Sequence, residues 1–171
     1  MNEAYAQLKQ MTKMLKNLRG WIDAGVAHAQ AKKFDPEVLT TLRLSPDMYT
    51  LTQQVQSACD GVKFLGARAT GTQAPKHEDT VKATIAELQA RIDSVLAYVE
   101  AFKPEQFDGF EDRTITMAFL PGKGSKGQDW LEEMNLPNTY FHLTMAYAIL
   151  RHNGVGIGKT EFIGDLKLHD V

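Results

Sequence analysis

MYTLTQQVQSACDGVKFLGARA (residues 48–69) and VKATIAELQARIDSVLAYVEAF (residues 81–102) repeat apolar residues at alternating spacings of three and four. Because an α-helix turns about every 3.6 residues, this spacing keeps a narrow apolar stripe on one face. A stripe of this length needs partner helices that run almost alongside it. The two stretches therefore predict an all-α fold, a four-helix bundle. The apolar positions are Met48, Leu51, Val55, Ala58, Val62, Leu65 and Ala69, then Val81, Ile85, Leu88, Ile92, Val95, Val99 and Phe102.

The first three helices have recognisable ends. Residues 2–27 repeat the same apolar spacing and predict the first helix. Ser45, which precedes Pro46, is a good N-cap candidate for the second helix, and Gly71 is a good residue to end it. We expect the third helix to begin near Asp79 and to end before Pro104, which cannot continue a helix.

The C-terminal third contains an extended segment and one more helix. Residues 113–119 alternate polar and apolar side chains, which predicts a short β-strand or hairpin insertion before the last helix. The last helix is expected to begin near Pro137 and to end at Asn153-Gly154. The glycine-rich segment 155–171 is expected to be irregular.

The last helix differs from the others because no Lys, Arg, Asp or Glu occurs between Met134 and Leu150. A helix that is apolar nearly all round is usually buried on all sides. It is therefore either the central helix of the bundle or it also covers a subunit interface, and we expect a homodimer. Asn135 and His142 argue against a membrane span, which needs about 20 apolar residues.

Composition limits the class of protein. The chain has 171 residues, a hydrophobic fraction of 43% and a formal net charge of -2, as expected for one domain over residues 1–171. No block of Lys or Arg suggests a nucleic-acid partner. The N-terminus lacks the pattern of a signal peptide, and the single cysteine, Cys59, fits a reducing cytoplasm. We interpret Cys59 as a small buried hydrophobic residue.

Four polar residues are candidates for a ligand site. Gln54, Asp60, Tyr140 and His142 lie in or next to apolar stretches, and buried polar groups must find partners. They could line an internal polar pocket for a small molecule that the sequence does not identify. Two alternatives remain open: Asp60 faces solvent, and His142 is a hydrogen-bonded core residue.

Two patterns resemble a metal site and a phosphate-binding loop, but both are incomplete. His142 and His152 are ten residues apart, which separates them by about 15 Å along one helix and prevents them from sharing a metal ion. The segment GVGIGKT (154–160) would need glycine at position 153 to form a phosphate-binding loop, and this residue is Asn153. Neither pattern predicts a metal or nucleotide site.

Two long segments resemble a known family. LPNTYFHLTMAYAILRHNGVGIGKTEFIG (136–164) and SPDMYTLTQQVQSACDGVKFLGARATG (45–71) are similar to a domain-of-unknown-function family found in bacteria and fungi. That family belongs to the DinB/YfiT-like superfamily, whose members are regarded as metalloenzymes. The resemblance implies an up-down-down-up four-helix bundle, usually dimeric. It also implies a divalent metal held by one histidine of the second helix and by a His-x-x-x-His of the last.

The sequence departs from the metal-binding pattern of the superfamily. The resemblance aligns His152 with one ligand, and places Ala148 and Gln54 at or near the other two positions. Alanine has no donor atom and glutamine is a poor ligand for soft metals, so we expect no metal and no other cofactor, although a divalent ion is possible. We therefore expect a homodimeric ligand-binding or structural protein with a degenerate metal site. The alternative is a thiol-dependent transferase or isomerase, like some superfamily members, with an altered divalent-metal site.

Overall fold

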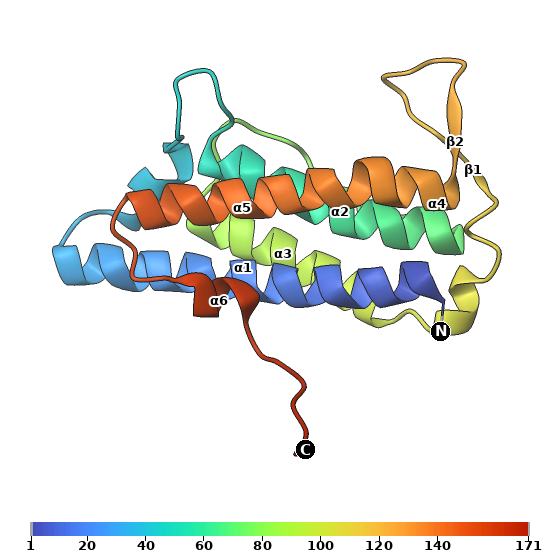
Figure 1. Ribbon diagram of the computed structural model, residues 1–171. Helices are drawn as coiled ribbons and strands as arrows, with labels where there is room; N and C mark the ends of the chain where they lie inside the picture. The colour runs from blue at the N-terminus through green and yellow to red at the C-terminus, as the bar shows by residue number, and fades with distance from the viewer. Residues whose placement is uncertain (1, 171) are drawn as a thin grey trace.

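The computed structural model describes residues 2–170, and its four longest helices lie side by side as a bundle (Figure 1). These helices are α1 (Glu3–Lys32), α2 (Leu51–Thr70), α3 (Ile85–Glu100) and α5 (Leu136–His152). In Figure 1, α1 and α5 run in one direction while α2 and α3 run in the other, so α2 and α3 are parallel. The predicted up-down-down-up bundle is confirmed.

Short elements connect and extend the four helices. Strands β1 and β2 form an antiparallel hairpin, which confirms the predicted insertion before the last helix. The helix α4 and the π-helical turn η3 follow the hairpin and lead directly into α5. The short elements are η1 (Pro36–Thr41), η2 (Pro104–Phe107), β1 (Thr114–Thr116), β2 (Gly124–Lys126), α4 (Gly127–Trp130), η3 (Leu131–Asn135) and α6 (Lys159–Ile163).

The apolar stripes form the core of the bundle. Every predicted stripe residue of α2 from Leu51 to Ala69 is buried, and so is every one from Ile85 to Phe102. Cys59 is also buried, and burial raises the pKa of its thiol to about 12. The interpretation of Cys59 as a small buried hydrophobic residue fits this environment.

The predicted starts of α2 and α3 were too early. Thr50, not Ser45, is the N-cap of α2, and it forms a capping box with Gln53. Likewise α3 begins after Thr84, which forms a capping box with Glu87, and not near Asp79. Met48 and Val81 therefore lie outside the helices, and Val81 is 68% exposed.

The later start of α3 makes the parallel arrangement possible. A parallel pair needs a connector that returns along the helix, and the 20 residues of α2 span roughly 30 Å. The connector comprises residues 71–84 and can reach about 45 Å when extended. Gly71 adopts the left-handed conformation (φ 72°) that ends α2, as predicted.

The helix α5, which has no charged residue before Arg151, is not the central helix of the bundle. It packs against α1 and α2 through Leu143, Ala146 and Ile149, but Phe141 on its outer face is 51% exposed. Of the two alternatives for this helix, the central position is therefore wrong, and the subunit interface stays a prediction. The helical segment also begins before Pro137, because α4 and η3 precede α5 without a break.

The C-terminal segment is more ordered than its glycines suggested. Val155 and Ile157 are buried, and residues 159–163 form α6 against α1. Phe162 of α6 stacks on Trp21, with ring centroids 5.3 Å apart. The Nε1 of Trp21 also donates a hydrogen bond to the Glu161 carbonyl oxygen (3.0 Å). The prediction of an irregular segment is wrong for α6.

Among residues 2–170, none of the helices combines the length and apolar character that a membrane crossing requires.

Gly61 is expected to control how closely α2 and α5 approach. A Cβ atom at Gly61 would overlap Thr139 Oγ1 and lie 3.0 Å from Thr139 Cβ. Gly61→Ala should therefore lower the free energy of unfolding by about 1–3 kcal/mol. The matched control is Gly20→Ala on the exposed side of α1, where no atom lies within 4 Å of the new Cβ. This control should raise stability by about 0.5–1 kcal/mol.

Urea unfolding followed by circular dichroism measures both changes. Equal effects of the two substitutions would contradict the close approach at Gly61.

Candidate functional site

A surface groove lies where the first turn of α2, the connector 42–50 and the first turns of α5 meet. Its volume is about 390 Å³. The side chains come from three separate parts of the chain, so only the folded bundle brings them together. The groove is lined by Asp47, Met48, Tyr49, Gln54, Asn138, Phe141 and His142.

The spacing of residues on α5 explains which of its side chains face the groove. Asn138, Phe141 and His142 are separated by three and four residues, and such residues share one face of a helix. Thr139 and Leu143, one position further along, are buried against the rest of the bundle. The groove face and the core face of α5 are therefore adjacent.

A hydrogen bond between α2 and α5 organises the groove. His142 Nδ1 lies 2.7 Å from Gln54 Oε1, and Gln54 Nε2 donates to the Tyr49 carbonyl oxygen (3.5 Å). Because the amide oxygen of Gln54 faces the imidazole, Nδ1 must carry the hydrogen and donate it. The second ring nitrogen, Nε2, then keeps its lone pair as an acceptor.

The environment of His142 favours its neutral form. Burial lowers the pKa of the imidazole below its ordinary value of 6.5, and the Asp60 carboxylate opposes this shift less strongly. A neutral imidazole at pH 7 can accept a proton or a hydrogen bond at Nε2.

Two exposed aromatic side chains flank the His142 ring. Tyr49 stacks on it with ring centroids 6.1 Å apart, and Phe141 meets it edge-on at 5.3 Å. Both aromatic residues are 51% exposed, so their rings are accessible. The groove thus combines apolar walls with a small number of polar side chains, the usual composition of a small-molecule site.

The structure brings together two of the four candidate residues, Gln54 and His142. Tyr140 does not line the groove, because two residues along a helix correspond to a rotation of about 200°. It packs against the hydrophobic core instead. The predicted pocket therefore does not include Tyr140.

Asp60 also lies outside the groove and belongs to an ion-pair cluster. Its Oδ1 is 2.7 Å from Lys63 Nζ and 2.8 Å from Arg91 Nη2. The Lys63 and Arg91 side chains are only 5% and 6% exposed, and Arg91 also pairs with Asp79. Asp60 thus compensates two buried cations and does not line the groove, and the alternative that it simply faces solvent is wrong.

The sequence interpretation missed most of the groove walls. Asn138 and Phe141 could have been found, because they share the helical face of His142. Met48 and Tyr49 lie in a connector, and no periodic pattern places a connector against α5.

The superfamily's three-histidine set does not fit these residues. His152 is exposed at the end of α5, about 15 Å along the helix from His142, and neither it nor Ala148 lines the groove. Gln54 pairs with His142 and not with His152, so the alignment that the resemblance suggested does not form one site. Within residues 2–170, no three His, Cys, Asp or Glu side chains are grouped closely enough to hold a metal ion.

Comparisons with known proteins agree with the bundle. A family model described as "Domain of unknown function (DUF1993)" matches residues 5–163. The crystal structure of a DinB family member protein from Shewanella denitrificans is similar to this chain, with 43% sequence identity and a TM-score of 0.90. The similarity covers 96% of this chain and 93% of that one. A search of curated proteins found no match.

Proposed function

We propose that this chain, which belongs to the DUF1993 family of unknown function and has a DinB-like helical fold, is a small-ligand-binding protein that uses the His142 groove. The observation that supports the proposal is the hydrogen bond from His142 Nδ1 to Gln54 Oε1. This bond orients the ring and leaves Nε2 as an acceptor between the Tyr49 and Phe141 rings. The homodimer and the cytoplasmic location are parts of the same proposal.

The chemistry of the groove defines a ligand class. The acceptor at Nε2 requires a hydrogen-bond donor such as a hydroxyl or thiol, and the aromatic walls favour an apolar or planar body. Asp47 is the only charged side chain among the lining residues, so nothing in the lining favours an anion. We propose a small neutral molecule with one donor group.

We further propose that the site works without a three-histidine metal centre. The groove supplies one imidazole, and Gln54 and Asn138 supply amide groups, which bind soft divalent metals weakly. The degenerate donor set supports ligand binding more than metal-assisted chemistry.

The second candidate function is a thiol-dependent transferase or isomerase with an altered divalent-metal site. The neutral His142 supports it, because Nε2 could accept the proton of a bound thiol and leave a thiolate. Such an enzyme would show turnover with a low-molecular-weight thiol. Turnover that His142→Phe abolishes would favour the enzyme over a binding protein.

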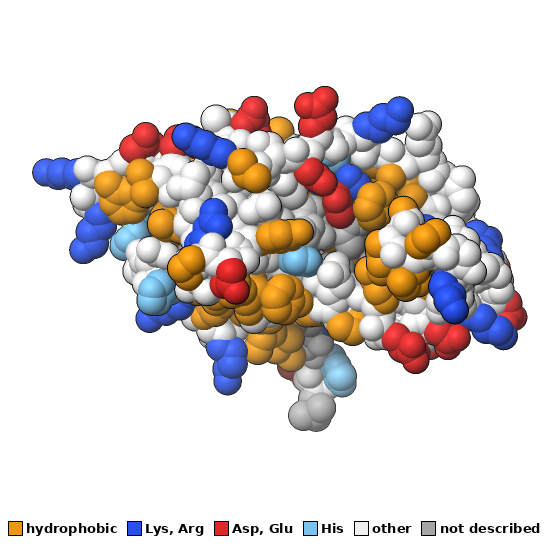
Figure 2. Space-filling view, turned by 90° about the horizontal axis from the view of Figure 1, so that it is seen from above, with side chains coloured by type: hydrophobic (Ala, Val, Ile, Leu, Met, Phe, Trp, Pro, Cys, Tyr) orange, Lys and Arg blue, Asp and Glu red, His pale blue; other side chains and the backbone are white. Residues whose placement is uncertain are grey.

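The outer surface of α5 supports the homodimer. No charged residue occurs between Met134 and Leu150, and Phe141 and Tyr49 are half exposed beside this surface. Figure 2 looks onto the molecule from above and shows hydrophobic side chains grouped over the hairpin, with further groups in the middle of the face. Within the hairpin, Phe119 is 65% exposed. Two copies could bring such surfaces together without like-charge repulsion.

The ligand proposal predicts a measurable preference for a donor group. p-Cresol and toluene have similar planar bodies, but only p-cresol has a hydroxyl. We expect p-cresol to bind roughly fivefold more tightly, because one additional hydrogen bond contributes about 1 kcal/mol. NMR titration should shift the signals of Tyr49, Phe141 and His142.

His142→Phe tests the origin of this preference, since it retains an aromatic ring but removes the acceptor. The preference for p-cresol should disappear in this variant. Equal affinities of both probes for the unmodified protein, or shifts confined to another surface, would contradict the proposed site.

The metal proposal predicts the composition of untagged protein that is purified without chelators. Elemental analysis should find well below one zinc, nickel or iron per chain, and divalent ions should not raise the melting temperature. About one metal ion per chain that is lost in His142→Phe would contradict the proposal and favour the enzyme.

The homodimer predicts a molecular mass near twice that of the chain at micromolar concentration, as measured by light scattering. Thr144→Arg places a charge on the exposed, uncharged side of α5 and should shift the mass toward that of the monomer. Gln10→Arg adds the same charge to an exposed position of α1 and serves as the control. A monomeric unmodified protein would exclude the dimer.

A further inference from the structure

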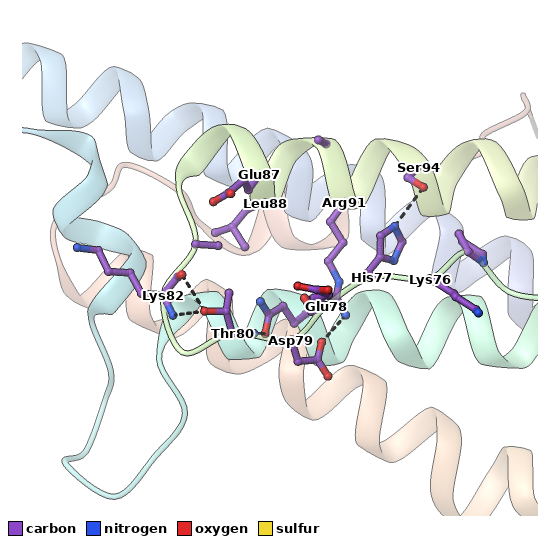
Figure 3. A pocket seen from close by; sticks show the side chains of 14 residues that line it. Lys76, His77, Glu78, Asp79, Thr80, Lys82, Glu87, Leu88, Arg91 and Ser94 are labelled. Atoms are coloured by element: carbon purple, nitrogen blue, oxygen red, sulfur yellow. Dashed lines mark hydrogen bonds and ion pairs between the residues drawn. The ribbon is translucent and has the colours of Figure 1, made fainter.

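The connector between the parallel helices α2 and α3 covers a cavity of its own. Residues 71–84, named the strap below, run along α2 and α3 without forming a helix or strand (Figure 3). This cavity is an open pocket of about 730 Å³ between the strap and α3, and α2 contributes Gln56 to its lining. The strap has no regular hydrogen-bond ladder, and side chains of the neighbouring helices contact it.

Several polar contacts hold the strap. Arg91 of α3 donates hydrogen bonds to the Glu78 carbonyl oxygen (3.0 Å) and to Asp79 Oδ1 (2.8 Å). The Thr80 amide nitrogen lies 3.3 Å from Gln56 Oε1 of α2. These contacts hold the C-terminal half of the strap, and none of them involves a histidine.

His77 holds the middle of the strap to both helices. Its Nδ1 lies 3.4 Å from Lys63 Nζ of α2, and its Nε2 lies 3.2 Å from Ser94 Oγ of α3. An ammonium group has only donors, so Nδ1 must be the acceptor. Nε2 then carries the hydrogen and donates it to Ser94. Both contacts therefore exist together in only one neutral tautomer.

This tautomer excludes a catalytic serine at position 94. A serine nucleophile must give its proton to an unprotonated ring nitrogen, and a carboxylate usually orients the opposite nitrogen. Here Lys63 faces the opposite nitrogen, so Nε2 is protonated and Ser94 accepts. Lys63, His77 and Ser94 therefore attach the strap to α2 and α3 and do not form a catalytic group.

We propose that the strap is released by acid, with His77 as the group that senses the proton. A protonated ring cannot accept at Nδ1, and it places a second cation 3.4 Å from Lys63 Nζ. The middle of the strap then loses its contact with Lys63 of α2, so the contacts at Glu78, Asp79 and Thr80 must hold the strap alone, and the pocket beside it widens.

The charges around His77 determine the pH range. Burial, and then the Lys63 and Arg91 cations, lower the pKa of His77 below 6.5, while the Asp60 and Asp79 carboxylates act in the opposite direction. Since the folded-state pKa is the lower one, the contact is fully formed above pH 6.5. It is lost as the pH falls from there through the folded-state pKa.

The test follows the strap amides and the His77 imidazole by NMR between pH 8 and pH 5. The amide signals of residues 72–83 should shift with the same midpoint as the imidazole, below 6.5. Hydrogen-exchange protection of the strap, corrected for intrinsic rates, should fall at least about tenfold relative to the α1 amides. Loss of protection in α1 to the same extent would mean global unfolding and would overturn the proposal.

Variants distinguish the effect of His77 from that of the other histidines. In His77→Gln the side chain cannot be protonated, so the pH dependence of strap protection should vanish. His169→Gln changes an exposed histidine near the C-terminus and should retain it. Strap protection that still falls with pH in His77→Gln would overturn the proposal.

A second variant is informative even if His77→Gln loosens the strap at every pH. Lys63→Gln removes the nearest cation and should raise the midpoint of both the imidazole and the strap. An unchanged midpoint in this variant would overturn the proposed role of the pair.

Discussion

The close approach of α2 and α5 is the constraint on which the groove depends. Gly61 has no side chain, so Thr139 of α5 can lie directly against α2. Thr139 Oγ1 donates to the Asn135 carbonyl oxygen of its own helical segment (2.7 Å), so the buried hydroxyl is satisfied without a partner on α2. With the two helices at this separation, Gln54 reaches His142. A wider separation would break a bond of 2.7 Å first, because a hydrogen bond weakens within a few tenths of an ångström.

The parallel orientation of α2 and α3 has a separate consequence. It requires the strap, and the strap requires polar side chains from both helices. Lys63 of α2 and Arg91 of α3 are therefore nearly buried, in helices that would otherwise be apolar on their inner sides. Such charges would be costly alone, and Asp60 compensates both of them. The topology of the bundle thus explains why a carboxylate is present at Asp60, which the sequence suggested as a ligand residue.

Sequence periodicity predicted the core of the molecule well, but it could not predict most of the candidate site. The stripes of α2 and α3 were correct because burial repeats with the helix, whereas the helix starts were missed where Thr50 and Thr84 begin capping boxes. The pairing of Gln54 with His142 was within reach, since both interrupt apolar stretches. The position of Tyr49 in the groove could not be predicted, because the path of a connector depends on tertiary contacts that have no local sequence signal.

Two histidines illustrate how the same side chain acquires opposite properties from its partner. Gln54 presents an oxygen to His142, so Nδ1 donates and Nε2 remains available for a ligand. Lys63 presents an ammonium group to His77, so Nδ1 accepts, Nε2 donates to Ser94, and neither nitrogen remains available. Burial lowers the pKa of both rings, so both are neutral at pH 7. A proton would remove the acceptor from His142 and the contact with Lys63 from His77. Acid would therefore weaken both ligand binding in the groove and the attachment of the strap.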